Sequence, residues 1–343
     1  MLKNLFLLFF STVISFILLD QLLLYAGFPT YSPLIQIYEP SNELGWKLKK
    51  NYDGIVTTSE GTWHVSIRDS RRSLPGQARS SGPQKVYAVG DSFAFAQAVD
   101  DNDVWLNILA RDISGRFNVV FENFGVPGYT PYHYNYVIDK LLPSDLKNDI
   151  VVYVFFAGND FVSFTFDDIR KNQSEMIRNE HEPAHYPAVK RIARSICSRS
   201  PITWAAASYI LNRYRDSADV PFFFRTPDQY LRSKRETATW GKTIELVTEG
   251  IQKVKSRGGR PLLVLLPYGR YYLDRSGPSV AKAISLDFIQ DILKKDRELE
   301  IIDMTPDVTL DNDILIAKWG HLNKKGNMIL AEKVKSSITP FLK

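Results

Sequence analysis

Four separate segments of the sequence offer groups that acyl-transfer chemistry could use. Ser92, in Gly90-Asp91-Ser92-Phe93, offers a hydroxyl, Gly128 a backbone N–H in a glycine-rich turn, Asn159 an amide and His321 an imidazole. Together they match a nucleophile, a general base and donors for an oxyanion hole. Singly, each has a simpler explanation as a helix cap, a tight turn or a surface residue. Their joint placement favours chemistry.

Five short apolar runs predict the strands that would position these groups. Each run is rich in β-branched or aromatic residues and is flanked by Gly, Asp, Asn or Pro, which is typical of strands buried on both faces. The runs cover residues 85–89, 118–123, 149–156, 261–266 and 299–302. Helical patterns between them, clearest over 240–254, predict a parallel, doubly wound α/β sheet. Ligands bind at the carboxyl ends of such strands, where the four groups would meet.

These motifs resemble those of the SGNH hydrolases, the GDSL-like lipases and esterases, over about residues 85–343. The resemblance implies a three-layer α/β/α fold with a five-stranded, flavodoxin-like parallel sheet. It also implies that Ser92 is the nucleophile and His321 the base. The N–H groups of Ser92 and Gly128 and the side chain of Asn159 would form the oxyanion hole. Upstream, residues 43–49 are similar to the N-terminal segment of membrane-anchored bacterial members.

One departure from the family pattern concerns the acid that orients the histidine. Members commonly have an aspartate two or three residues before it, where this chain has Trp319 and Lys318. Loss of that aspartate can lower turnover by ~10⁴. Three alternatives follow: Asp313 or Asp311 reaches His321 from the preceding loop, a backbone carbonyl serves a Ser-His dyad, or the enzyme is weak or inactive. We expect Asp313 to be the third catalytic residue.

The N-terminus carries a long apolar segment over residues 5–26. As a helix it would be about 33 Å long, which is enough to cross a hydrocarbon core of ~30 Å. Lys3 precedes the segment and Glu39 is the first charged residue beyond it, so the positive-inside rule places the N-terminus in the cytoplasm. We expect a single-pass anchor in a cytoplasmic-type membrane, with the rest of the chain on the extracytoplasmic, periplasmic side. A cleaved signal is the alternative, although its apolar core is usually shorter.

The remaining chain divides by composition. We expect the anchor over 1–28, a tether and a small β-rich segment over 29–84, and a hydrolase-like domain over 85–343 with a helical insertion at about 162–235. Within that insertion, residues 186–215 hold six Lys or Arg and no acidic residue. This stretch is either a solvated helix face or a surface that docks on anionic lipid headgroups.

Composition excludes several other classes of protein. The 343 residues are 44% hydrophobic and 24% charged, which is typical of a globular chain and not of a disordered or multi-span membrane chain. The single cysteine excludes a disulfide framework. His181 and His185 are four residues apart, but Pro183 between them disfavours a ligand-bearing helix. We expect no metal, no cofactor and no nucleic-acid partner.

The function that these observations predict is a membrane-anchored serine ester hydrolase. Its substrate would be an O-acyl group of an envelope glycan or lipid, cleaved through an acyl-enzyme on Ser92. One alternative is a carbohydrate O-acyltransferase on the same fold. Another is a catalytically weak or inactive module that binds a glycan or lipid, because the usual aspartate before His321 is absent.

Overall fold

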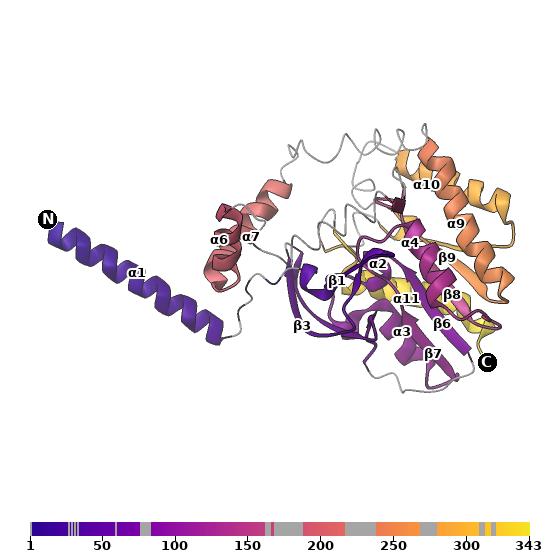
Figure 1. The fold of residues 1–343 in the computed structure, drawn as a ribbon, viewed down its shortest axis with the longest axis horizontal. Coiled ribbons are helices and arrows are strands. Elements are labelled where there is room, and N and C mark those ends of the chain that lie inside the picture. Colours follow the sequence, from indigo (N-terminus) through magenta and orange to yellow (C-terminus); the bar gives the residue numbers. More distant parts are fainter. Residues whose placement is uncertain are drawn as a thin grey trace.

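The computed structural model describes residues 2–26, 28, 30, 32, 34–58, 60–75, 84–161, 166–167, 188–216, 238–267, 280–308, 313–316 and 320–343. Within them, one large sheet is covered by helices, and an N-terminal helix projects away from it (Figure 1). The predicted α/β class is therefore confirmed.

Five parallel strands form the centre of the sheet, in the order β10-β9-β8-β6-β7. They are β6 (Gln84–Gly90), β7 (Val119–Asn123), β8 (Ile150–Phe156), β9 (Arg260–Leu266) and β10 (Glu300–Asp303). Each lies within one residue of a predicted run at both ends. Their flavodoxin-like order places the chain reversal beside β6, so the carboxyl end of β6 opens into the crevice where such sheets bind ligands.

Helices cover both faces of these strands, as the three-layer prediction requires. One core contains residues of α3 (Trp105–Ile113) and α11 (Lys324–Ile338) together with Val86, Val152 and Val264 of the sheet. The other contains residues of α4 (Pro131–Tyr136), α9 (Ala238–Ser256) and α10 (Val280–Lys295) together with Tyr87, Val151 and Leu263. Neighbouring strand residues face opposite sides, which separates the two cores. The helix predicted over 240–254 is α9.

Three antiparallel strands extend the sheet beyond β7. They are β3 (Asn51–Thr58), β4 (Gly61–Arg68) and β5 (Arg71–Arg72), and β5 joins β7 where Arg72 pairs with Asn123. β3 and β4 pair along their whole lengths, so the hairpin turn around Glu60 is held at a fixed position. The β-rich segment predicted upstream of residue 84 is thus continuous with the main sheet.

Part of the segment expected to be a tether has regular structure. Residues Leu34–Ile37 form a 3-10 turn, and β1 (Tyr38–Ser41) pairs with β2 (Gly45–Leu48). Ile37 and Tyr38 are buried. The β1–β2 hairpin packs on the loop before α4, where Trp46 donates from Nε1 to the carbonyl of Pro127 (3.2 Å) and accepts from Tyr129 Oη at its own carbonyl (2.9 Å). It also contacts α4 itself, because the carbonyl of Leu44 lies 3.1 Å from His133 Nε2.

Helix α1 (Leu2–Tyr25) contains a 20-residue stretch, Phe6–Tyr25, that is long and apolar enough to cross a membrane, as a signal sequence would also be. It contacts α7 (Pro201–Asp216), which follows α6 (Ala188–Cys197). Both helices fall in the predicted insertion, and most of its remaining residues lie outside the described ones. The short helices are α2 (Ser92–Phe95), η2 (Asp101–Asp103), η3 (Val137–Leu141), η6 (Thr305–Asp307) and η7 (Thr339–Phe341).

Candidate active site

Ser92 lies at the sharp turn between β6 and α2. Before the turn, Gly90 leaves no room for a side chain, because a Cβ there would come within 2.8 Å of the carbonyl oxygen of Val154 on β8. The carboxylate of Asp91 caps α2 by accepting the backbone N–H of Phe93 (2.9 Å). These contacts deliver the hydroxyl of Ser92 to the carboxyl end of the strand.

His321 meets Ser92 as predicted, although 229 residues separate them. Its Nε2 lies 2.8 Å from Ser92 Oγ, and its ring lies beside that of Phe93, with 4.9 Å between centroids. The loop that carries His321 is fixed at both sides: its carbonyl accepts from the N–H of Ile316 (2.9 Å), and Asn323 caps α11. The serine and the histidine are therefore at hydrogen-bonding distance, as proton transfer requires.

Glu60 contacts the other nitrogen of the imidazole. Both of its carboxylate oxygens lie 2.9 Å from His321 Nδ1, and one of them also accepts the backbone N–H of His321 (3.4 Å). Burial raises the pKa of Glu60, but the charge of His321 and hydrogen bonds from His321 and Gln97 outweigh burial and lower this pKa to about 2. Glu60 is thus ionised at neutral pH and positioned to hold the imidazole in one tautomer.

Glu60, and not Asp313, therefore lies beside His321 Nδ1, at the position where we expected Asp313. Asp313 is exposed, has φ of +35°, and contributes its carbonyl as an acceptor for the side-chain amide of Asn323 (2.8 Å). Among the described residues, Glu60 is the carboxylate that hydrogen-bonds His321. Asp311, Lys318 and Trp319 lie outside the described residues.

The sequence carried only a weak signal for Glu60. The residue is 261 positions from His321, so no local spacing connects the two. The alternating runs over 54–58 and 63–67 indicated only a β-rich segment, and the structure shows that Glu60 lies in the turn between two of its strands. Placing that turn at the active site requires the pairing of β5 with β7, which the alternation of residues does not determine.

Gln97 links Glu60 to the loop that follows Ser92. Its side-chain amide donates to Glu60 Oε2 (2.9 Å), while its backbone N–H donates to the carbonyl of Ser92 (2.8 Å). The loop turns sharply here, since Ala96 and Ala98 both have left-handed φ values of 59° and 68°. Gln97 thus contacts both Glu60 and Ser92 and holds them close together.

The three predicted oxyanion donors surround the carboxyl ends of β6, β7 and β8. No described residue accepts the N–H of Ser92 or of Gly128, so both are available to a ligand. Gly128 has φ of +85°, and a Cβ there would lie 3.2 Å from the ring of Trp46. Asn159 donates one N–H of its amide to Asp91 Oδ2 (3.0 Å), which fixes its orientation and leaves its second N–H.

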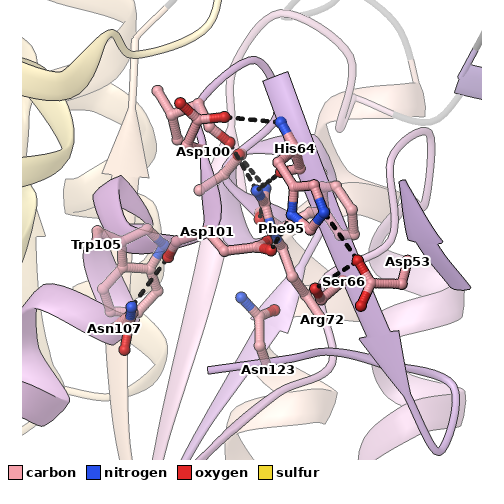
Figure 2. A network of polar contacts seen from close by, with 12 residues as sticks. Asp53, His64, Ser66, Arg72, Phe95, Asp100, Asp101, Trp105, Asn107 and Asn123 are labelled. Atoms are coloured by element: carbon pink, nitrogen blue, oxygen red, sulfur yellow. Dashed lines mark hydrogen bonds and ion pairs between the residues drawn. The ribbon is translucent and has the colours of Figure 1, made fainter. Parts of the chain in front are cut away.

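The buried side chain of Arg72 donates hydrogen bonds to the loop that follows Ser92 (Figure 2). Arg72 donates to the carbonyls of Phe95 (2.9 Å) and Val99 (2.6 Å), to that of Ala96, and to Asp101 Oδ1 (3.2 Å). Burial lowers the pKa of Arg72 to about 10, so it stays charged at neutral pH. Because Arg72 belongs to β5, the sheet extension supports the loop after Ser92 as well as carrying Glu60.

The same network continues to the hairpin strands through His64. Its Nδ1 lies 3.0 Å from Asp101 Oδ2 and its Nε2 lies 2.8 Å from Asp53 Oδ1. The hydrogen bond with Asp101 is the main cause that raises the pKa of His64. Figure 2 shows His64 between the two carboxylates, next to Arg72.

The described residues hold no cluster of three or more His, Cys, Asp or Glu side chains suited to a metal ion. His181 and His185 lie outside those residues. What the site offers chemically is a hydroxyl, an imidazole, a carboxylate and oriented N–H donors.

A scan of family models finds no match to the chain, and a search of curated proteins finds none either. Solved structures with a similar arrangement include that of TesA, with 15% identity over 76% of this chain and 100% of that one, and a TM-score of 0.45. The acetylxylan esterase Axe2 from Geobacillus stearothermophilus has 11% identity over 78% and 99% of the two chains and a TM-score of 0.43.

A third such structure is a member of the lipolytic G-D-S-L family from Veillonella parvula, with 12% identity over 75% and 98% of the two chains and a TM-score of 0.41. These identities are low and the TM-scores lie below 0.5.

Proposed function

We propose that this protein is a serine ester hydrolase of the SGNH type, with Ser92 as nucleophile, His321 as general base and Glu60 as the orienting acid. One observation carries the proposal. Ser92 Oγ lies 2.8 Å from His321 Nε2, and His321 Nδ1 lies 2.9 Å from Glu60. A serine, an imidazole and a carboxylate joined in this order form the arrangement that activates a hydroxyl for acyl transfer.

In the acylation step, Ser92 Oγ attacks the ester carbonyl while its proton passes to His321 Nε2. Glu60 stabilises the imidazolium through Nδ1, because it remains ionised well below neutral pH. The N–H groups of Ser92, Gly128 and the Asn159 amide would donate hydrogen bonds to the carbonyl oxygen and stabilise the negative charge that develops on it. The tetrahedral intermediate then collapses, and His321 returns the proton to the departing alcohol.

In the deacylation step, water takes the place of the alcohol. His321 removes a proton from the water as it attacks the acyl carbon, and Ser92 leaves with that proton. The products are a carboxylic acid and free enzyme. A carbohydrate hydroxyl in place of water would give the transferase alternative, since both reactions use the same acyl-enzyme.

The proposed location is the outer surface of a cytoplasmic-type membrane, with the hydrolase domain on the periplasmic side. Helix α1 supports an anchor by its length and composition, and Lys3, which precedes the apolar stretch Phe6–Tyr25, supports this orientation. An anchored site of this kind would act on O-acyl groups of an envelope glycan or of a lipid. No nucleic-acid partner and no cofactor enter the proposal.

Glu60 also bears on the alternative of an inactive binding module. That alternative was based on the missing aspartate before His321. A carboxylate that reaches Nδ1 from the β3–β4 turn supplies the interaction that the aspartate would otherwise make.

Covalent labelling tests the proposal. A fluorophosphonate probe should label the wild-type protein and not Ser92→Ala, and only the wild type should release p-nitrophenol from p-nitrophenyl acetate. The matched control is Ser73→Ala, which changes another serine of the described chain outside the site. Equal labelling and equal rates for wild type and Ser92→Ala would refute the hydrolase proposal.

A further inference from the structure

A second feature of the molecule lies far from the active site, where α1 meets α7. Asp20 is the one charged residue between Phe6 and Tyr25, and the protein buries it to 8% relative exposure. Its Oδ1 accepts from Ser200 Oγ (2.9 Å) and from the backbone N–H of Ile202 (3.2 Å). Ser200 in turn accepts the N–H of Thr203 (3.1 Å) at the start of α7.

These contacts join a carboxylate to the N-terminus of a 16-residue helix. Free N–H groups and the helix dipole both stabilise negative charge at that end. The acid that would be costly within an apolar anchor is therefore satisfied by α7. The contact between Asp20 and α7 also fixes the position of the α6–α7 pair along α1.

The position of Asp20 along α1 sets the depth of this pair. Asp20 precedes Tyr25 by five residues, which is about 7.5 Å along a helix. If Phe6–Tyr25 spans the hydrocarbon core, the start of α7 lies about 7.5 Å inside its outer boundary. A helix that lies in the membrane interface buries its apolar face by ~5–10 Å. The depth of about 7.5 Å at the start of α7 falls within that range.

Helix α6 has the composition of such an interfacial helix. Val189, Ile192, Ala193 and Ile196 follow helical spacing, and the basic residues Lys190, Arg191 and Arg194 alternate with them, with no acidic residue in the helix. Ile192 is 59% exposed and Ile196 is 48% exposed. Large apolar side chains on a basic helix, uncovered by the protein, fit a surface that anionic lipid covers.

We propose that α6, held at the correct depth by the contact of Asp20 with α7, lies in the outer interface of an anionic bilayer. This inference rests on the membrane anchor of the proposed function, and it assigns a second, in-plane contact with lipid beyond the anchor. The basic residues of α6 would meet anionic headgroups while Ile192 and Ile196 enter the acyl boundary. A transmembrane anchor leaves a domain free to rotate, and an in-plane helix would remove that freedom.

Cysteine labelling of the full chain in vesicles tests this inference. Cys197→Ala gives a background without cysteine, since the chain has only one. In that background, Ile192→Cys and Ile196→Cys carry an environment-sensitive fluorophore, with Ser198→Cys, an exposed position one residue beyond the end of α6, as the matched control. The vesicles contain phosphatidylcholine and phosphatidylglycerol at 3:1, with bromine on the acyl chains as the quencher.

The expected result is at least threefold stronger quenching at Ile192→Cys and Ile196→Cys than at Ser198→Cys, weakened when phosphatidylglycerol is omitted. Asp20→Leu should reduce the quenching at both positions, and Asp20→Asn, which still accepts hydrogen bonds, should not. Equal, weak quenching at all three positions would overturn the inference. So would protection from aqueous iodide without quenching by bromine, since protein would then cover this face.

Two controls distinguish a failure of the proposed α6 lipid contact from a failure of the membrane anchor or of the hydrolase proposal. Ile14→Cys, within the proposed anchor, should be quenched strongly, and its failure would remove the anchor together with the inference. Hydrolysis of p-nitrophenyl acetate by the same vesicles reports the proposed function independently. A full rate with no quenching on α6 would refute only the lipid contact.

Discussion

Single residues decide the charge of the active site. Glu60 is 11% exposed at its side chain and accepts hydrogen bonds from two partners, so its negative charge is held in place beside the imidazole. An ionised carboxylate at Nδ1 leaves Nε2 unprotonated and available to take the proton of Ser92. The acid that orients His321 is therefore the carboxylate in contact with it, Glu60, and not the acid nearest to it in the sequence.

The first prediction compares Glu60 with Asp313. Glu60→Gln should lower kcat by about 10³ to 10⁴, as loss of the triad acid does, because the neutral amide cannot stabilise the imidazolium. Asp313→Asn should change kcat by less than about twofold, because Asp313 is exposed and contributes its backbone carbonyl. Steady-state rates with p-nitrophenyl acetate measure both. A large loss in Asp313→Asn with none in Glu60→Gln would restore the sequence-based assignment.

The second prediction concerns Gln97 as a positioning residue. Gln97→Leu removes the donor to Glu60 and should lower kcat about tenfold with KM unchanged, which corresponds to one hydrogen bond to a charged group. Thr62→Ala is the control, since Thr62 is exposed on the same hairpin two residues after Glu60. A rise in KM without a fall in kcat would show that Gln97 contacts substrate instead.

At the scale of elements, the loops of the parallel sheet and the added strands contribute different parts of the site. The loops after β6, β7 and β8 bring Ser92, Gly128 and Asn159, and the loop before α11 brings His321. The β3–β4 hairpin brings Glu60, and β5 brings Arg72. The added strands are therefore part of the proposed active site.

The third prediction tests the support from β5. Arg72→Met should lower the free energy of unfolding by ~3–5 kcal/mol, because it leaves the buried carboxylate of Asp101 and several loop carbonyls without their donor. Arg71→Met removes a half-exposed ion pair with Glu122 and should cost less than ~1 kcal/mol. Urea denaturation measures both. Adding Asp101→Leu to Arg72→Met should recover part of the loss, and an additive effect would contradict this explanation.

The fourth prediction concerns pH and the packing of the β1–β2 hairpin on α4. His133 donates from Nε2 to the carbonyl of Leu44 (3.1 Å) and accepts from the N–H of Thr130 at Nδ1 (3.1 Å), which requires the neutral ring. Burial lowers the pKa of His133 from 6.5 to about 3. The unfolded chain takes up this proton first, so stability is complete above pH 6.5 and is lost as pH falls toward 3.

The slope should approach ~1.4 kcal/mol per pH unit below the unfolded pKa. His133→Gln keeps a donor and an acceptor but does not titrate, so it should flatten the decline in unfolding free energy between pH 6.5 and 5. His64→Gln is the control, because the pKa of His64 is raised and its stabilisation is lost as pH rises instead. An unchanged acid slope in His133→Gln would contradict the assignment.

The sequence was most informative where structure is local. Apolar runs typical of strands buried on both faces predicted all five parallel strands. The residues that follow those runs placed Ser92 and Gly128 beyond the carboxyl ends of the strands. Glu60 and Arg72 could not be predicted in the same way. Their roles depend on β5 pairing with β7 and on a hairpin turn reaching His321, which are long-range contacts that no local periodicity encodes.

At the scale of the whole molecule, the first 75 residues have two separable parts. Helix α1 (Leu2–Tyr25) contacts α7, whereas residues 34–75 pack on the sheet and reach the active site. The anchor and the sheet extension should thus differ sharply in what their removal does.

The fifth prediction compares two truncations. A chain that begins at residue 29 should keep the wild-type rate on soluble p-nitrophenyl acetate, because it retains Glu60, Arg72 and the β1–β2 hairpin. A chain that begins at residue 84 should lose at least 10³ in rate, since it lacks the triad acid. Fluorophosphonate labelling gives the same comparison without turnover. Wild-type labelling of the shorter chain would show that the extension is dispensable.

The position of Glu60 at a hairpin tip has a consequence for inhibition. Ser92 follows a central strand and His321 precedes α11, but the acid is carried by the turn between β3 and β4, and β3 is the edge strand of the sheet. An antibody or a peptide that bound this hairpin and drew it outward would separate the carboxylate from the imidazole without contacting Ser92. The enzyme could then be silenced from its outside edge, by a ligand that bears no resemblance to an ester.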